Sequence, residues 1–90
     1  MTRDPVAWTM VGEGWDVVDP GGESVGRVKE VVGDPNADIF DGLVITRGLL
    51  RKDHYLPSER VTAIYEGRVE IDLGEREVEG LGESARTAGR

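Results

Sequence analysis

Two glycines five positions apart, Gly21 and Gly26, stand in the stretch DPGGESVGRVKEVV with the spacing of a phosphate-binding loop. Such a loop also needs a lysine and a serine or threonine at its end, followed by a helix whose N–H groups face the phosphates. Arg27 and Val28 occupy those two positions, and valine cannot ligate a magnesium ion. The β-branched residues that follow favour a strand. The stretch therefore predicts a turn between two strands, with a bulge or sharp coil at Gly26.

A second group of polar side chains has the spacing of a cation-binding loop. The first, third and fifth positions of a calcium loop are matched by Asp34, Asn36 and Asp38. The sixth position requires glycine and the twelfth a bidentate glutamate, but Ile39 and Ile45 stand there. Asp41 adds one more oxygen donor. We therefore expect a solvated turn, and we keep a metal- or small-molecule-responsive domain as an alternative.

The single histidine, His54, has no evident catalytic partners. A nucleophilic site needs a histidine beside a hydroxyl or thiol and a carboxylate. The chain has no cysteine, and its serines and threonines lie in no recognisable active-site motif. We expect His54 to be a surface or half-buried strand residue. The sequence thus predicts a protein that is not an enzyme and carries no cofactor and no metal.

Charge is distributed unevenly along an acidic chain. The formal net charge is −7, which disfavours binding to nucleic acid and to anionic membranes. Eight acids lie between residues 13 and 41, whereas five bases lie between residues 42 and 68. This split suits oriented contact between proteins, although it could equally serve solubility alone. The candidate protein-contact residues are those of the basic segment around its apolar pair: Arg47, Leu49, Leu50, Arg51, Lys52 and His54.

Ninety residues are enough for one domain, and their pattern is that of a β protein. No window keeps a helical apolar stripe, and short segments rich in valine and isoleucine recur at intervals of about ten residues. We expect an all-β barrel of five or six strands over residues 13–73, preceded by a lead-in strand or arm over residues 1–12. Within the lead-in, Val6, Trp8 and Met10 alternate as in a strand. Residues 74–90 are expected to form a flexible tail with at most one helical turn near residues 75–81.

The order of these segments resembles a known family. VVDPGGESVGRVKEVVGD, then IFDGLVITRG, then YLPSERVTAIYEGRVEIDL is similar to the PRC-barrel domain, over about residues 11–73. The resemblance implies a small all-β barrel without catalytic residues that commonly self-associates. It also implies an adaptor or assembly role, as in the photosynthetic reaction centre and in a ribosome-maturation factor, and it is closest to short stand-alone bacterial proteins.

These observations predict a non-enzymatic protein-interaction module. We expect it to be cytoplasmic, to form a homodimer and to bind another protein, without membrane insertion. One alternative is a ribosome- or RNA-associated assembly factor, in which case binding would rely on Arg47, Arg51, Lys52, Arg60 and Arg68.

Overall fold

The computed structural model describes residues 4–48 and 51–82. Six strands, two short 3₁₀ helices and one short α-helix follow one another along the chain: η1 (Trp8–Met10), β1 (Asp16–Val18), β2 (Ser24–Asp34), β3 (Ile39–Thr46), β4 (His54–Pro57), η2 (Ser58–Arg60), β5 (Val61–Tyr65), β6 (Arg68–Ile71) and α1 (Glu75–Glu79). The predicted all-β class is confirmed.

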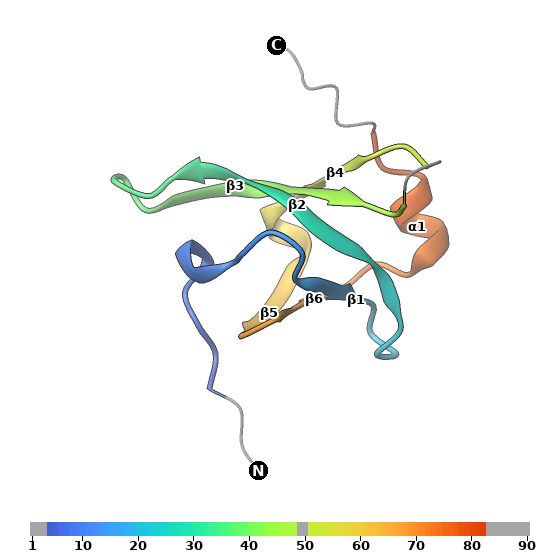
Figure 1. Ribbon diagram of the computed structural model, residues 1–90, viewed down its shortest axis with the longest axis horizontal. Coiled ribbons are helices and arrows are strands. Elements are labelled where there is room, and N and C mark those ends of the chain that lie inside the picture. The colour runs from blue at the N-terminus through green and yellow to red at the C-terminus, as the bar shows by residue number, and fades with distance from the viewer. Residues whose placement is uncertain (1–3, 49–50, 83–90) are drawn as a thin grey trace.

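The strands form one strongly bent six-stranded sheet in the order β4-β3-β2-β1-β6-β5. Neighbouring strands run antiparallel except β1 and β6, which run parallel. Figure 1 shows how the long strand β2 joins two layers: β3 and β4 lie on one side, and β1, β6 and β5 cross below them. The hydrophobic core lies between these layers, and α1 packs at one end.

The predicted turn between β1 and β2 is present. Asp19 Oδ1 accepts hydrogen bonds of 2.9 Å from the backbone N–H groups of Gly21 and Glu23. Gly22 has a φ of 87°, which a residue with a side chain rarely adopts. The pairing shifts register between Val17, opposite Gly26, and Val18, opposite Ser24, and Gly26 has a φ of 158°, so the irregularity predicted at Gly26 is present.

The core is made of valine, leucine and isoleucine side chains from every strand except β5, which contributes the partly buried Val61. Its fully or nearly fully buried members are Val17, Val25, Val28, Leu43, Ile45, Leu56, Val69, Ile71, Leu73 and Val78. The predicted hairpin around Glu66 and Gly67 is confirmed by the pairing of β5 with β6. Its expected alternation is also confirmed, because Val69 and Ile71 are buried whereas Asp72 is exposed.

The predicted lead-in strand at residues 6–10 is wrong. Trp8–Met10 forms the 3₁₀ helix η1, closed by hydrogen bonds from Met10 N–H to Ala7 O and from Val11 N–H to Trp8 O. The indole of Trp8 folds back onto the end of the β2–β3 hairpin, where it stacks on Phe40 at a centroid distance of 5.2 Å. Its Nε1–H also donates to Asp38 Oδ1 at 2.9 Å. These long-range contacts outweigh the local alternation.

The ordered part of the chain also extends beyond residue 73, where the sequence analysis placed the start of a flexible tail. The expected helical turn is present as α1, and Val78 is 0% exposed in the core. The helix begins after Gly74, whose N–H donates to Glu77 Oε1 at 2.7 Å. Residues 74–82 are therefore part of the folded unit, while residues 83–90 lie outside the described residues.

The sheet does not close into the expected barrel, because β4 and β5 are its two edges. Each edge is instead covered at one point by a terminal segment. Val6 N–H donates to Ile64 O of β5 at 3.0 Å, and Tyr55 N–H of β4 donates to Gly82 O at 3.1 Å. Segments before η1 and after α1 thus occupy edge positions that would otherwise be open to another strand.

Candidate functional site

Arg47, the first residue of the predicted contact patch, is a structural residue. Its side chain is only 6% exposed, and its Nε–H donates to Val25 O of β2 at 2.9 Å. Its two terminal nitrogens lie 3.2 Å from Glu75 Oε2 and 3.4 Å from Glu79 Oε2. The guanidinium therefore fastens α1 to the sheet, and it is not available to a partner.

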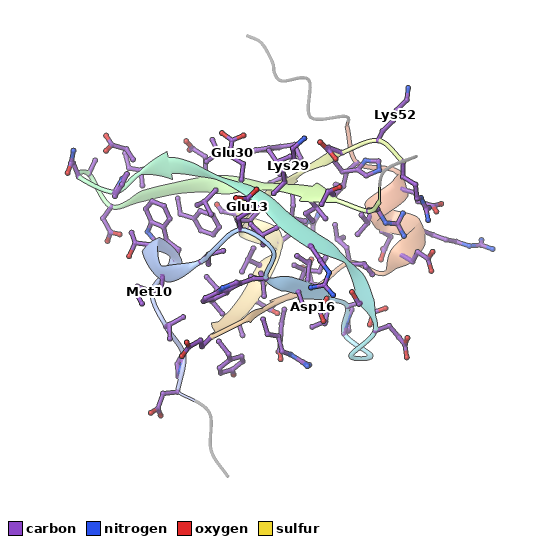
Figure 2. The ribbon with its side chains drawn as sticks, viewed as in Figure 1. Met10, Glu13, Asp16, Lys29, Glu30 and Lys52 are labelled. Atoms are coloured by element: carbon purple, nitrogen blue, oxygen red, sulfur yellow. The ribbon has the colours of Figure 1, made fainter. Side chains whose placement is uncertain are left out.

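The other candidate contact residues differ from one another in exposure and in the groups they contact. Arg51 is half exposed and pairs with Glu79 at 3.0 Å. Lys52 is exposed at the chain surface, as Figure 2 shows. Nδ1 of His54, on β4, lies 3.2 Å from the carbonyl oxygen of Leu81. Leu49 and Leu50, the predicted apolar contact point, lie outside the described residues.

Three further bases among the described residues are also engaged by carboxylates of the chain itself. Three further ion pairs are Arg60 with Asp72 at 3.3 Å, Arg68 with Glu70 at 3.0 Å and Lys29 with Asp53 at 2.7 Å. The hydrogen bond from Lys29 holds the pKa of Asp53 below its ordinary value, with Coulombic attraction from the same ammonium adding to it. The basic segment inferred from the sequence is thus largely neutralised in the fold.

A shallow depression of about 590 Å³ lies where α1 meets β2 and β3. Arg27, Arg47 and Arg51 line it together with Glu75. Each guanidinium is already engaged by an oxygen of the chain: Arg47 and Arg51 as above, and Arg27 through a 3.1 Å hydrogen bond from Nη1 to Gly14 O. The depression is the seam along which α1 docks against the sheet.

The acids of the β2–β3 hairpin, in contrast, make no ion pair within residues 4–48 and 51–82. Asp34 and Asp38 accept hydrogen bonds from Asn36 N–H and from the Trp8 indole, so their oxygens shape the turn. No three or more His, Cys, Asp or Glu side chains of the described residues lie together as ligands for a metal ion. The described structure therefore supplies no ligand set for the cation-responsive alternative.

A surface that sequence inspection missed lies on the outer side of β2, β3 and β4. Residues that face each other across these strands form rows, one of which is Glu30, Val44 and Tyr55. Leu43 and Leu56 in the next row point into the core, so the row with Tyr55 points away from it. In Figure 2 Glu30 and Lys29 lie on the side of β2 away from β5 and β6. We call this the outer face, formed by Glu30, Val32, Ile39, Asp41, Val44 and Tyr55.

Tyr55 lies flat across β3 on the outer face. A Cβ atom added to Gly42 would be 2.6 Å from the Tyr55 hydroxyl oxygen and 2.7 Å from Cζ, so only glycine permits this placement. Burial raises the pKa of the Tyr55 phenol, and the negative charges of Asp41 and Glu59 raise it further. The phenol therefore lies in a negative potential made by Asp41 of β3 and Glu59 of η2. The signal available in the sequence was that Tyr55 and Leu56 must point to opposite faces of a strand, so a buried Leu56 places Tyr55 on the outer face.

Within residues 4–48 and 51–82 no helix is long and apolar enough to cross a membrane. Compared with models of protein families, residues 13–78 match the PRC-barrel domain, so the match runs into α1. No curated protein matches the chain. Among solved structures, the chain is similar in fold to RimM of Pseudomonas aeruginosa, a protein to which 16S ribosomal RNA processing is ascribed. The TM-score is 0.54 and the identity 20%, over 79% of this chain and 45% of RimM.

Proposed function

Because this chain belongs to the PRC-barrel domain family, we propose that it acts as a non-enzymatic adaptor, a module that binds another protein. Family membership fixes the kind of fold, and the adaptor role is inferred from the surface. The chain spans less than half the length of RimM, so the role of that larger protein does not transfer to it directly.

The pairing of bases with acids is the observation that carries this proposal. Nucleic-acid binding depends on lysine and arginine side chains placed against phosphates. Here Arg47, Arg60 and Arg68 are engaged by carboxylates of the same chain. The acids of the β2–β3 hairpin make no ion pair among the described residues, and they lie beside partly exposed apolar side chains. A surface of this kind repels phosphates and suits contact with a protein.

Affinity capture from native lysate tests the proposal. The tagged protein is incubated with lysate in the presence and absence of RNase, and the bound proteins are identified by mass spectrometry. An adaptor retains a discrete protein partner in both samples. Recovery of material that disappears completely after RNase treatment would contradict the proposal.

The second candidate function is that of a ribosome-associated assembly factor. The likeness in fold to RimM favours it, although at 20% identity that likeness concerns the fold. Sedimentation of lysate through a sucrose gradient distinguishes the two candidates. An assembly factor comigrates with ribosomal subunits and is released by raised salt, whereas an adaptor for another process stays in the light fractions.

Self-association, a cytoplasmic location and cation binding stay predictions. Sedimentation equilibrium of the purified protein gives its mass, and twice the chain mass is the value expected for the homodimer. The cation-responsive alternative requires a higher melting temperature in about millimolar Ca²⁺ or Mg²⁺. An unchanged melt would leave that alternative without support.

A further inference from the structure

The outer face of β2, β3 and β4 combines three properties that rarely occur together on a solvated sheet. It carries apolar side chains, its aromatic residue lies flat on the backbone, and its charged residues are mostly of one sign. Ile39 is 50% exposed, which is high for a residue of that size. In Figure 1 no helix or strand of the described residues lies over this face.

The apolar part of the face follows the middle of the three strands. Ile39 opposes Asp34 near the end of the hairpin, and Val44 opposes Tyr55 further along β3. Val44 is only 6% exposed although it points away from the core. Neighbouring side chains on the sheet surface therefore shield Val44, so the exposed apolar contact on this face comes mainly from Ile39.

The charge on this face is negative around the ring. Asp41 and Glu59 are both exposed, and both act on the Tyr55 phenol. Glu30 is exposed in the same row as Tyr55. None of these three carboxylates forms an ion pair within the described ranges, whereas Lys29, next to Glu30 on β2, is matched by Asp53. A cation approaching Tyr55 would thus meet acids that no base of the described chain neutralises.

A ring with negative charge on its face and carboxylates beside it is a binding site for a guanidinium or an ammonium group. The cation is attracted to the negative face of the aromatic ring. Each exposed carboxylate adds a modest Coulombic attraction, and a carboxylate can hold arginine through two parallel hydrogen bonds. Ile39 on the same face provides apolar contact for the aliphatic side chains of the same partner.

We propose that the outer face binds a basic protein segment, with a lysine or arginine side chain of that segment placed over the Tyr55 ring between Asp41 and Glu59. This inference rests on the adaptor function proposed above and adds the location of its contact and the chemistry of its partner. A protein segment is favoured over a second copy of this chain because the chain is acidic, with a net charge of −7. Within the described residues, carboxylates of the same chain also pair with several of its bases: Lys29, Arg47, Arg51, Arg60 and Arg68.

Titration of the ¹⁵N-labelled protein with a synthetic peptide of alternating arginine and valine tests the inference by NMR. The predicted shifts are concentrated on residues 41–44, 55 and 59. The same peptide with glutamate in place of arginine should leave the spectrum unchanged. Raising the salt from about 0.05 M to about 0.3 M should weaken the binding, because exposed charges are then screened.

Two pairs of substitutions with the same change in net charge distinguish binding at the outer face from a general attraction to an acidic protein. Asp41→Asn combined with Glu59→Gln removes two acids beside the ring and should weaken binding about tenfold. Glu23→Gln combined with Glu66→Gln removes two acids from turns in the other half of the molecule and should change the affinity by less than about twofold. Tyr55→Phe keeps the ring and should bind like the wild type, whereas Tyr55→Leu should lose most of the binding.

Three outcomes would overturn the inference. The two double variants could lose affinity equally, the chemical shift changes could spread over the whole surface, or the arginine peptide could fail to bind. If the protein captured from lysate is retained by Tyr55→Leu and by the Asp41→Asn, Glu59→Gln variant, the adaptor function stands and its contact lies on another surface. If neither wild type nor variant captures a protein, the adaptor function itself is wrong.

Discussion

Gly26 is a residue of β2 that lies in close contact with β3. A Cβ atom there would be 2.5 Å from Ile45 Cγ2 and 2.9 Å from Thr46 O, so the strands would have to separate to admit it. The sequence pointed to this glycine as an irregularity in a strand, but the reason for it is a contact with residues some twenty positions away. Such an approach is set by strand pairing and leaves no local signal.

Gly26→Ala should lower the free energy of unfolding by about 1–3 kcal/mol, because it overpacks a core contact. The matched control is Gly80→Ala, where the new Cβ would be 3.5 Å from its nearest neighbour and the backbone is already helical. That variant should change stability by less than about 0.5 kcal/mol. Urea denaturation followed by tryptophan fluorescence measures both, and equal midpoints would contradict the proposed contact.

Lys29 and Asp53 form an ion pair that no sequence pattern predicted, because β2 and the segment before β4 meet only through the fold. Asp53 has a pKa below its ordinary value, so the folded state favours the ionised form. The ionised Asp53 stabilises the fold at pH values above its pKa in the unfolded chain, which is about 4. This stabilisation is lost as the pH falls through the lower pKa of Asp53 in the folded protein.

Asp53→Asn should therefore reduce stability at neutral pH by about 0.2–1 kcal/mol, the range for a solvent-screened pair. As the pH is lowered from neutral through the folded-state pKa of Asp53, the wild type and the variant should come to unfold at the same denaturant concentration, because Asp53 is protonated in the wild type below that pKa. Parallel urea titrations over this pH range provide the measurement. A stability difference that persists in acid would show that the pair is not its source.

At the scale of elements, the strands follow the sequence pattern closely and the terminal segments do not. Short segments rich in valine and isoleucine, separated by turn residues, predicted β1, β2, β3, β5 and β6. The period of two that one buried face leaves was evident in the closing hairpin, where Val69 and Ile71 are buried. Val6, Trp8 and Met10 alternate in the same way, yet Trp8–Met10 is a 3₁₀ helix. The cause is that Trp8 stacks on Phe40 and donates a hydrogen bond to Asp38 at the end of the β2–β3 hairpin. The burial of α1 was missed because Val78 and Leu81 are too few to give a periodic pattern.

The role of α1 can be tested through its buried side chain. Val78→Ala should cost about 1–3 kcal/mol, because Val78 is 0% exposed in the core. Arg76→Ala, on the exposed side of the same helix, should cost less than about 0.5 kcal/mol. Thermal unfolding followed by circular dichroism compares them. If Val78→Ala melted like the wild type, residues 74–82 would be the flexible tail first expected.

Arg47 and Arg51 both pair with acids of α1, but substituting them should change the free energy of unfolding by different amounts. Arg47→Gln should destabilise by about 1–3 kcal/mol, since a side chain only 6% exposed loses charged hydrogen bonds to Val25 O and to α1. Arg51→Gln should cost at most about 1 kcal/mol, because its pair with Glu79 is half exposed. Equal losses in urea denaturation would contradict the structural role assigned to Arg47.

At the scale of the whole molecule, the sequence supported the family and the fold class, and it did not reveal where the surface charge lies. The family resemblance follows from the order of strands and turns, which a chain retains even when its surface changes. The contact patch around residues 47–54 was inferred from linear clusters of bases. In the fold, Glu75 and Glu79 of α1 pair with Arg47 and Arg51 of that cluster. The Tyr55 ring on the outer face, in contrast, lies near acids of β3 and η2 that are distant from each other in sequence.

The most direct test of the central claim is affinity capture from RNase-treated lysate with three forms of the protein. These are the wild type, the Asp41→Asn, Glu59→Gln variant and the Glu23→Gln, Glu66→Gln control, all with unfolding midpoints measured beforehand. The account predicts that the wild type and the control retain the same basic protein partner and that the outer-face variant loses it. Retention of that partner by all three forms, or capture that depends on RNA, would contradict the account.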